Sequence, residues 1–171
     1  MKNKGQILNM VLSALFAAMI AVFVAWFFHI PVVIGSHSAY IHFGDAFIFL
    51  AASLLPTPYA VAAAGIGGAL GDVFCGAPHW APFTLIIKIL VALMFTARGE
   101  KVLCRRNLLA VIPVMLITVG GYYLAEAVIA GNLLAPIVSV WGNVVQVIGS
   151  MAIYIALGAV TQRLKIKNLI K

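Results

Sequence analysis

The chain has 171 residues, of which 64% are apolar and 9% carry a formal charge, and its mean hydropathy is +1.14. Soluble domains carry about 25% charged residues. This composition therefore excludes a soluble enzyme, a disordered tail and a nucleic-acid-binding protein, despite the net charge of +7. We expect one integral membrane domain over residues 1–171, all-α, with six transmembrane helices.

Apolar runs separated by Gly- and Pro-rich turns predict the six helices. The first covers residues 7–28, which is long enough to cross the membrane. A signal peptide has a shorter apolar core of about 7–15 residues, so we expect this helix to be retained. Residues 31–38 are predicted to form a loop. The other five predicted helices cover residues 43–55, 59–74, 82–97, 108–130 and 139–162.

The basic residues indicate the orientation of these helices. If the N-terminus is cytoplasmic, six spans place residues 98–107 and the C-terminus on the same side, together with ten of the eleven Lys and Arg residues. This is the distribution that the positive-inside rule requires. The positive net charge then reflects topology and contact with anionic membrane lipid rather than a nucleic-acid partner. Cys75 and Cys104 fall at opposite ends of the predicted bundle and lack metal-ligand spacing, so we expect neither a disulfide nor a metal site.

Four ionisable residues are predicted to lie at membrane depth, where such groups are costly and mark function by default. They are Asp45, Asp72, Lys88 and Glu126, and all four fall in the outer half of the predicted bundle. Asp45 is interpreted as a helix cap. Asp72 and Lys88 are interpreted as a structural ion pair, although Lys88 could instead contact a ligand. Glu126 has no basic partner at its depth on the last two helices, which favours a functional role.

The last predicted helix adds a polar face that includes Asn143 and Gln146. Tyr122 shares a face with Glu126 on the preceding helix, and Trp80 and Trp141 fall at outer helix ends. These side chains predict a polar cavity with an aromatic rim, which opens outward between the last three helices. The alternative interpretations are hydrogen bonding between helices and, for the tryptophans, anchoring at the membrane surface.

Small residues form a stripe on the first predicted helix. They recur at helical spacing, which allows close approach of another helix, and they are Ala14, Ala18, Ala21 and Ala25. The stripe is either an internal packing face or a docking face for a partner membrane protein.

Residues 40–88, with the sequence YIHFGDAFIFLAASLLPTPYAVAAAGIGGALGDVFCGAPHWAPFTLIIK, resemble the substrate-binding S component of energy-coupling factor (ECF) vitamin transporters. The resemblance lies in a Gly-Asp that opens the second helix, a Gly/Ala helix that ends in Gly-Asp, and the pattern Ala-Pro-x-Thr-Leu-Ile-Ile-Lys. It is closest to the branch that contains riboflavin, pyridoxine and hydroxymethylpyrimidine transporters. Over the rest of the chain the resemblance is architectural.

The resemblance implies a vitamin-binding protein of the prokaryotic plasma membrane, with both termini cytoplasmic and no cofactor of its own. It implies a transmembrane coupling protein and two ABC-type ATPases as partners, with the alanine stripe as the docking face. The loop after the first helix, with His37 and Tyr40, is implied to gate the ligand. Asp45, Asp72 and Lys88 belong to the shared motif and are expected to shape the fold. The expected ligand contacts are Trp80, Lys88, Tyr122, Glu126, Trp141, Asn143 and Gln146, and the ligand that fits these side chains best is pyridoxine or a hydroxymethylpyrimidine-like heteroaromatic.

Two other functions compete with this interpretation. A stand-alone secondary transporter or channel would work without ATPases, but the two halves of the chain show no internal repeat. An intramembrane aspartyl protease would use Asp45 and Asp72, but the second motif lacks the first Gly of the Gly-x-Gly-Asp pattern. We therefore expect no catalytic residues and no enzyme activity.

Overall fold

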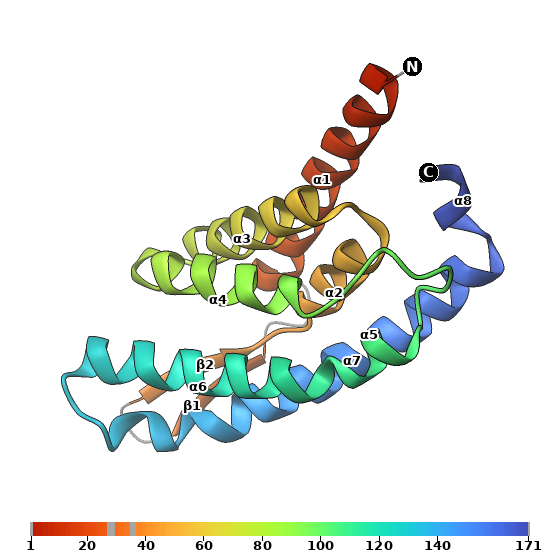
Figure 1. Ribbon diagram of the computed structural model, residues 1–171. Coiled ribbons are helices and arrows are strands. Elements are labelled where there is room, and N and C mark those ends of the chain that lie inside the picture. Colours follow the sequence, from red (N-terminus) through yellow and green to blue (C-terminus); the bar gives the residue numbers. More distant parts are fainter. Residues whose placement is uncertain (1, 27–29, 35–36, 171) are drawn as a thin grey trace.

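The computed structural model describes residues 2–26, 30–34 and 37–170, with side chains described for residues 4–26 and 42–170. It is a bundle of helices (Figure 1). The six main helices confirm the predicted all-α membrane class. They are α1 (Lys2–Ala25), α2 (Asp45–Leu54), α3 (Thr57–Phe74), α4 (Ala81–Leu93), α6 (Val111–Ala130) and α7 (Ser139–Arg163). Short helical turns accompany them: η1 (Pro78–Trp80), α5 (Arg105–Leu109), η2 (Ala135–Ile137) and α8 (Ile166–Ile170).

The segment after α1 differs from the prediction of a loop. It forms an antiparallel hairpin of β1 (Ile30–Ile34) and β2 (His37–Ile41), in which Ile30 is opposite Ile41 and Ile34 is opposite His37. The loop interpretation rested on Pro31 and the Gly and Ser at positions 35 and 36. The β-branched residues of the sequence Ile-Pro-Val-Val-Ile favour an extended strand instead.

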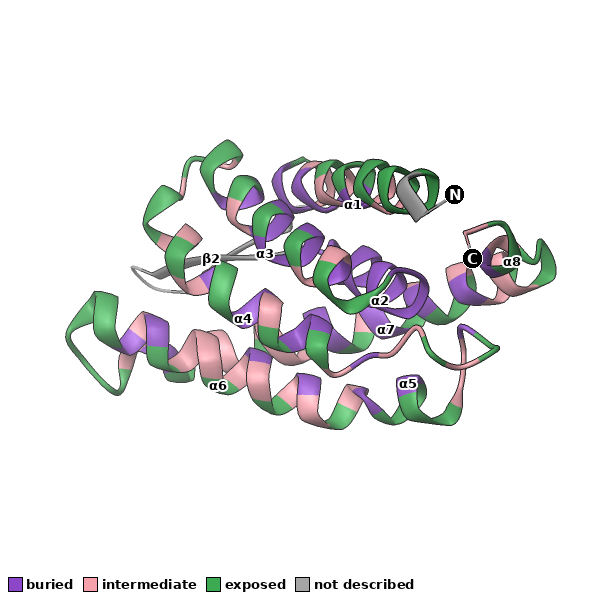
Figure 2. Cartoon of the chain, turned by 45° about the horizontal axis from the view of Figure 1, so that its top comes forward, coloured by how far each residue is buried: buried purple, intermediate pink, exposed green. Residues whose placement is uncertain are grey.

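The short helix α2 lies in the centre of the bundle. All ten of its residues are buried, and it contacts α1, α3, α4 and α7 (Figure 2). A helix that is apolar on every side is stable only inside a protein or a membrane. Ten residues rise only about 15 Å, so α2 is too short to cross a hydrocarbon layer of about 30 Å.

Three helical segments are long and apolar enough to cross a membrane: Lys4–Ala25, Arg105–Ala130 and Ala135–Arg163. The segments Asp45–Leu54 and Pro78–Leu93 are apolar but shorter. The six predicted helices are therefore present among the described residues, whereas six complete membrane crossings stay a prediction.

The Gly/Ala-rich helix α3 packs between α1 and α4. Gly67 faces α1, where an added Cβ would lie 2.7 Å from the Ala17 carbonyl oxygen. Gly68 faces α4, where an added Cβ would lie 2.9 Å from Cγ of Lys88. The glycines therefore bring three helices close together and help to place Lys88 beside the central helix.

This close packing makes a stability prediction. We expect Gly67→Ala to lower the free energy of unfolding by about 1–3 kcal/mol, because the backbone of α1 must move away from the new methyl group. Gly120→Ala on α6 is the matched control, since an added Cβ there meets nothing within 4 Å. The control should be neutral or stabilising by up to about 1 kcal/mol. Thermal unfolding of both variants in detergent measures the difference, and equal stability would contradict the packing described for α3.

The connections between the helices fall into two groups, one at each end of the bundle. Both termini and the segment between α4 and α5 lie at one end, which we call the terminal end (Figure 1). The connections between α3 and α4 and between α6 and α7 lie at the opposite end. The basic residues Arg98, Lys101, Arg105, Arg106 and Arg163 belong to the terminal end.

A buried polar network fixes the terminal end. Asn107 is fully buried, and its Nδ2 lies 3.0 Å from Ser53 Oγ and 2.9 Å from the Val102 carbonyl oxygen. Tyr154 Oη donates to the same carbonyl at 2.9 Å and lies 2.8 Å from Ser53 Oγ. Lys167 of α8 donates to the Ser53 carbonyl oxygen at 3.1 Å. These bonds tie the α4–α5 segment and α8 to the central helix α2.

Candidate functional site

A buried ion pair connects α2 and α4. Lys88 Nζ lies 2.7 Å from Asp45 Oδ1 and 2.9 Å from Asp45 Oδ2, and both side chains have zero exposed surface. The predicted partner of Lys88 was Asp72, so this part of the prediction is wrong. Helix α4 contacts both α2 and α3, and helical periodicity alone does not decide which of the two faces Lys88.

Asp45 is held from a second side by α7. Gln146 Nε2 donates to Asp45 Oδ2 at 3.1 Å, and Gln146 is only 3% exposed. The predicted capping role of Asp45 is wrong, because the cap position is Gly44 and no side chain caps the helix. The carboxylate of Asp45 instead joins α4 and α7 to the central helix.

Tyr122 of α6 closes the other side of the ion pair. Its hydroxyl shares a hydrogen bond of 3.1 Å with Thr84 Oγ1, and Lys88 Nζ lies 5.1 Å from the centre of its ring. This distance is within the range of a cation–π interaction. The ring of Trp80 meets Tyr122 edge-on, with 6.1 Å between ring centres. We call Asp45, Thr84, Lys88, Tyr122 and Gln146 the polar cluster; it brings together α2, α4, α6 and α7.

Buried polar groups also flank this cluster. Asp72 of α3 is 2% exposed. Thr118 lies one helical turn from Tyr122 on α6, and Ser150 lies one turn from Gln146 on α7. Both have zero exposed surface, and neither hydroxyl has a hydrogen-bond partner among the described residues. Buried hydroxyls are normally satisfied, so these two could accept a polar ligand group or a water molecule.

Glu126 and Asn143 lie beyond the cluster toward the end opposite the termini. Both are partly exposed, and neither forms an ion pair or a hydrogen bond within the described part of the chain. Trp141, which was predicted to belong to the aromatic rim or to anchor the chain at the membrane surface, is 75% exposed. His37 and Tyr40 belong to β2, but their side chains lie outside the described residues.

The alanine stripe is divided by burial. Ala14 and Ala18 are exposed, whereas Ala21 is 2% and Ala25 is 8% exposed. The buried half belongs to the internal packing of α1, and the exposed half remains accessible to another helix.

Sequence reasoning found most of the polar cluster but missed Thr84. The motif included this residue, yet a threonine on an apolar helix gave no sign that it would bond to a tyrosine 38 positions later. It also missed Asn107 and Ser53, whose importance depends on the fold of the segment between α4 and α5.

The geometry does not favour the protease interpretation. An aspartyl dyad shares a proton between its carboxyl groups, whereas both oxygens of Asp45 lie within 3 Å of Lys88. Among the described residues, no three His, Cys, Asp or Glu side chains are grouped so that they could hold a metal ion. The arrangement of rings, amides and a neutralised ion pair suits recognition of an uncharged polar molecule.

The fold and this cluster define an integral membrane protein with a buried polar site between its helices. Comparison with known proteins identifies its class: residues 4–163 match the family described as "ECF-type riboflavin transporter, S component". The chain belongs to this family, as its sequence motifs indicated.

A protein of Pyrococcus woesei, described as "Uncharacterized protein in gap 3'region", is 46% identical over 55 residues. The match covers 32% of this chain and 36% of that protein.

Proposed function

We propose that this protein binds a small heteroaromatic vitamin from outside the cell and delivers it together with a transmembrane coupling protein and two ABC-type ATPases. The observation that carries the proposal is the polar cluster, in which four helices bring a neutralised ion pair, an amide and a tyrosine together inside a membrane protein of the S-component family.

The chemistry of the site suggests the ligand class. Asp45 and Lys88 neutralise each other, so the cluster offers hydrogen bonds and ring faces rather than a net charge. Glu126 and Asn143 lie beyond the polar cluster, toward the end opposite the termini, and their polar groups have no partner among the described residues. They can accept hydrogen bonds from hydroxyl groups of a ligand, and Asn143 can donate to its ring nitrogens. Trp80 and Tyr122 offer aromatic surfaces. A neutral or weakly charged heteroaromatic with hydroxyl groups matches these side chains.

Riboflavin and pyridoxine are the first ligands to test. Riboflavin is favoured by the description of the matching family. Pyridoxine, and with it hydroxymethylpyrimidine, is favoured by the small number of polar side chains at the site. A direct comparison of the three affinities identifies the ligand.

We place the terminal end in the cytoplasm of a prokaryotic cell, because the basic residues of this multi-pass chain gather there. The polar cluster is then reached from outside, where a captured vitamin arrives. Gating by the β1–β2 hairpin, through His37 and Tyr40, is part of the same proposal.

Dependence on ATPases separates this proposal from a stand-alone secondary transporter. The protein is reconstituted in liposomes with and without the coupling protein and the two ATPases. Uptake of labelled vitamin should require all partners and ATP. Uptake by the protein alone, driven by an ion gradient, would contradict the proposal.

The exposed half of the alanine stripe makes a prediction about docking. Ala18→Leu should leave ligand binding unchanged and weaken association with the coupling protein by about 5- to 150-fold, because overpacking of an interface costs about 1–3 kcal/mol. Co-purification and ATP-driven uptake measure this loss. Ala62→Leu, at an exposed alanine of α3, is the control and should bind the coupling protein normally.

Equal association of Ala18→Leu and the unmodified protein would exclude the exposed stripe as the docking face. Ala21→Leu is not suitable for this test, because its side chain would enter the packed interior.

A further inference from the structure

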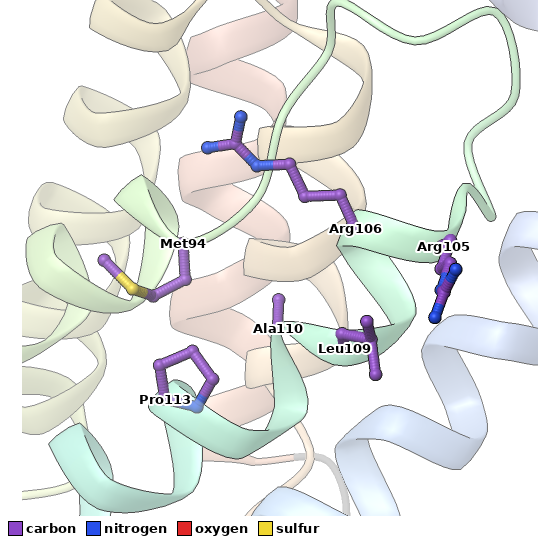
Figure 3. A pocket seen from close by; sticks show the side chains of 6 residues that line it. All are labelled: Met94, Arg105, Arg106, Leu109, Ala110 and Pro113. Atoms are coloured by element: carbon purple, nitrogen blue, oxygen red, sulfur yellow. The ribbon is translucent and has the colours of Figure 1, made fainter.

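A hollow of about 500 Å³ opens at the terminal end, between the end of α4 and the junction of α5 with α6 (Figure 3). It is lined by Met94, Arg105, Arg106, Leu109, Ala110 and Pro113. It belongs neither to the polar cluster nor to the alanine stripe.

The junction between α5 and α6 lies at this hollow. Helix α5 ends at Leu109 and α6 begins at Val111. Pro113 has no N–H group, so the carbonyl of Leu109 lacks its usual donor four residues later, and proline commonly breaks or kinks a helix in this way. Ala110 at the junction nevertheless keeps helical dihedral angles, and its N–H donates to the Arg106 carbonyl oxygen at 3.0 Å, so α5 and α6 continue as one apolar segment.

The lining combines a cationic rim with an apolar floor. Arg105 and Arg106 are both exposed, and no carboxylate is among the lining residues. Figure 3 shows Arg106 extending over the hollow toward Met94, while Arg105 lies on the opposite side of the helix start. Met94, Leu109 and Pro113 supply the apolar surface below.

The apolar surface continues beyond the hollow along one face of α6. Leu109 is 51%, Ile112 61% and Leu116 71% exposed, and their spacing places them on the same side of the helix. The segment Arg105–Ala130 is long and apolar enough to cross a membrane. Arg105 and Arg106 therefore lie at the start of this membrane-spanning segment, directly before the exposed apolar face of α6.

We propose that this hollow is a binding site for one anionic phospholipid of the surrounding membrane. The headgroup phosphate pairs with Arg106, which extends over the hollow, since guanidinium groups bind phosphate oxygens through paired hydrogen bonds, and Arg105 adds positive charge at the rim. One acyl chain covers Met94, Leu109 and Pro113 and follows the exposed face of α6. The charge of the rim and the length of the apolar track together select a lipid over a free phosphate or an acidic protein segment. Basic pockets between transmembrane helices bind such headgroups in other membrane proteins.

The test uses the full chain, purified in detergent and stripped of lipid. Native mass spectrometry measures binding of phosphatidylglycerol and of phosphatidylcholine with the same acyl chains. We expect phosphatidylglycerol to bind with a stoichiometry of one and more tightly than phosphatidylcholine. The double variant Arg105→Gln/Arg106→Gln should weaken this binding by roughly 5- to 30-fold. The control Lys101→Gln/Arg163→Gln removes the same charge from exposed positions outside the hollow and should bind as the unmodified protein does.

Arg105→Lys/Arg106→Lys keeps the charge and should retain most of the affinity, which provides a test if the glutamine variant folds poorly. Equal affinity for the two lipids would overturn the proposal, because the hollow would then be an ordinary apolar surface. An equal loss in the control variant would show general attraction to the basic end and would also overturn it. The proposal would also be overturned if the Arg105→Gln/Arg106→Gln variant bound lipid normally but no longer bound the coupling protein. The occupant of the hollow would then be a protein.

Discussion

Replacement of Lys88 by Met is expected to lower the free energy of unfolding by about 3–5 kcal/mol, because it leaves the carboxylate of Asp45 buried without its cation. Lys88 supplies the closest contacts of that carboxylate, at 2.7 and 2.9 Å, and neither side chain has any exposed surface. The hydrogen bond from Gln146 is too weak to replace the ionic partner. Thermal and chemical unfolding in detergent measure the loss.

The double variant Asp45→Asn/Lys88→Met provides the control for this prediction. Removal of both charges leaves no unpaired ion, so the double variant should regain much of the stability that Lys88→Met loses. If the two substitutions lowered the stability additively, the structural role of Lys88 would be contradicted. It would also be contradicted if Lys88→Met had normal stability but lost ligand binding. Lys88 would in the latter case be a ligand contact.

Replacement of Glu126 by Gln, and separately of Asn143 by Ala, is expected to raise the dissociation constant of the vitamin by roughly 10- to 150-fold. Loss of the charge-assisted hydrogen bond from Glu126 costs about 1.5–3 kcal/mol once the ligand has displaced water, and removal of the Asn143 amide leaves its partner group on the ligand unsatisfied, which costs a similar amount of about 1–3 kcal/mol. Both residues lie next to the polar cluster and have no partner within the described part of the chain, so their removal should leave the stability of the empty protein unchanged. Equilibrium binding to the purified protein measures the effect.

Glu100→Gln is the matched control, because it removes a carboxylate from an exposed position at the terminal end. It should bind the vitamin normally. If Glu126→Gln and Glu100→Gln bind equally well, Glu126 takes no part in recognition and the ligand lies deeper, nearer to Thr118 and Ser150.

The helices could be predicted from the sequence because hydropathy and the Gly and Pro residues act locally. The range of α3, predicted as 59–74, is observed as Thr57–Phe74, and α7, predicted as 139–162, is observed as Ser139–Arg163. The hairpin could not be predicted in the same way, since Pro31 and Gly35 suggested a turn while the β-branched residues between them favoured a strand.

The partner of Asp45 depended on packing that no local pattern reveals. Helix α2 is buried on every side, so its single carboxylate had to meet a cation from one of its neighbours. The sequence showed that Lys88 lay at a suitable depth, but it did not show that Gly68 lets α4 approach the bundle closely. The same reason applies to Asn107, which resembles an ordinary loop residue until the fold places it against Ser53.

The central claim is that the polar cluster forms part of a vitamin site, and native mass spectrometry of the gently purified protein tests it most directly. We predict one bound heteroaromatic vitamin per chain, with riboflavin and pyridoxine as the masses to examine first, and its loss in the Glu126→Gln/Asn143→Ala double variant. The central claim would be contradicted if the stably folded protein carried no such molecule and bound none of riboflavin, pyridoxine and hydroxymethylpyrimidine on titration.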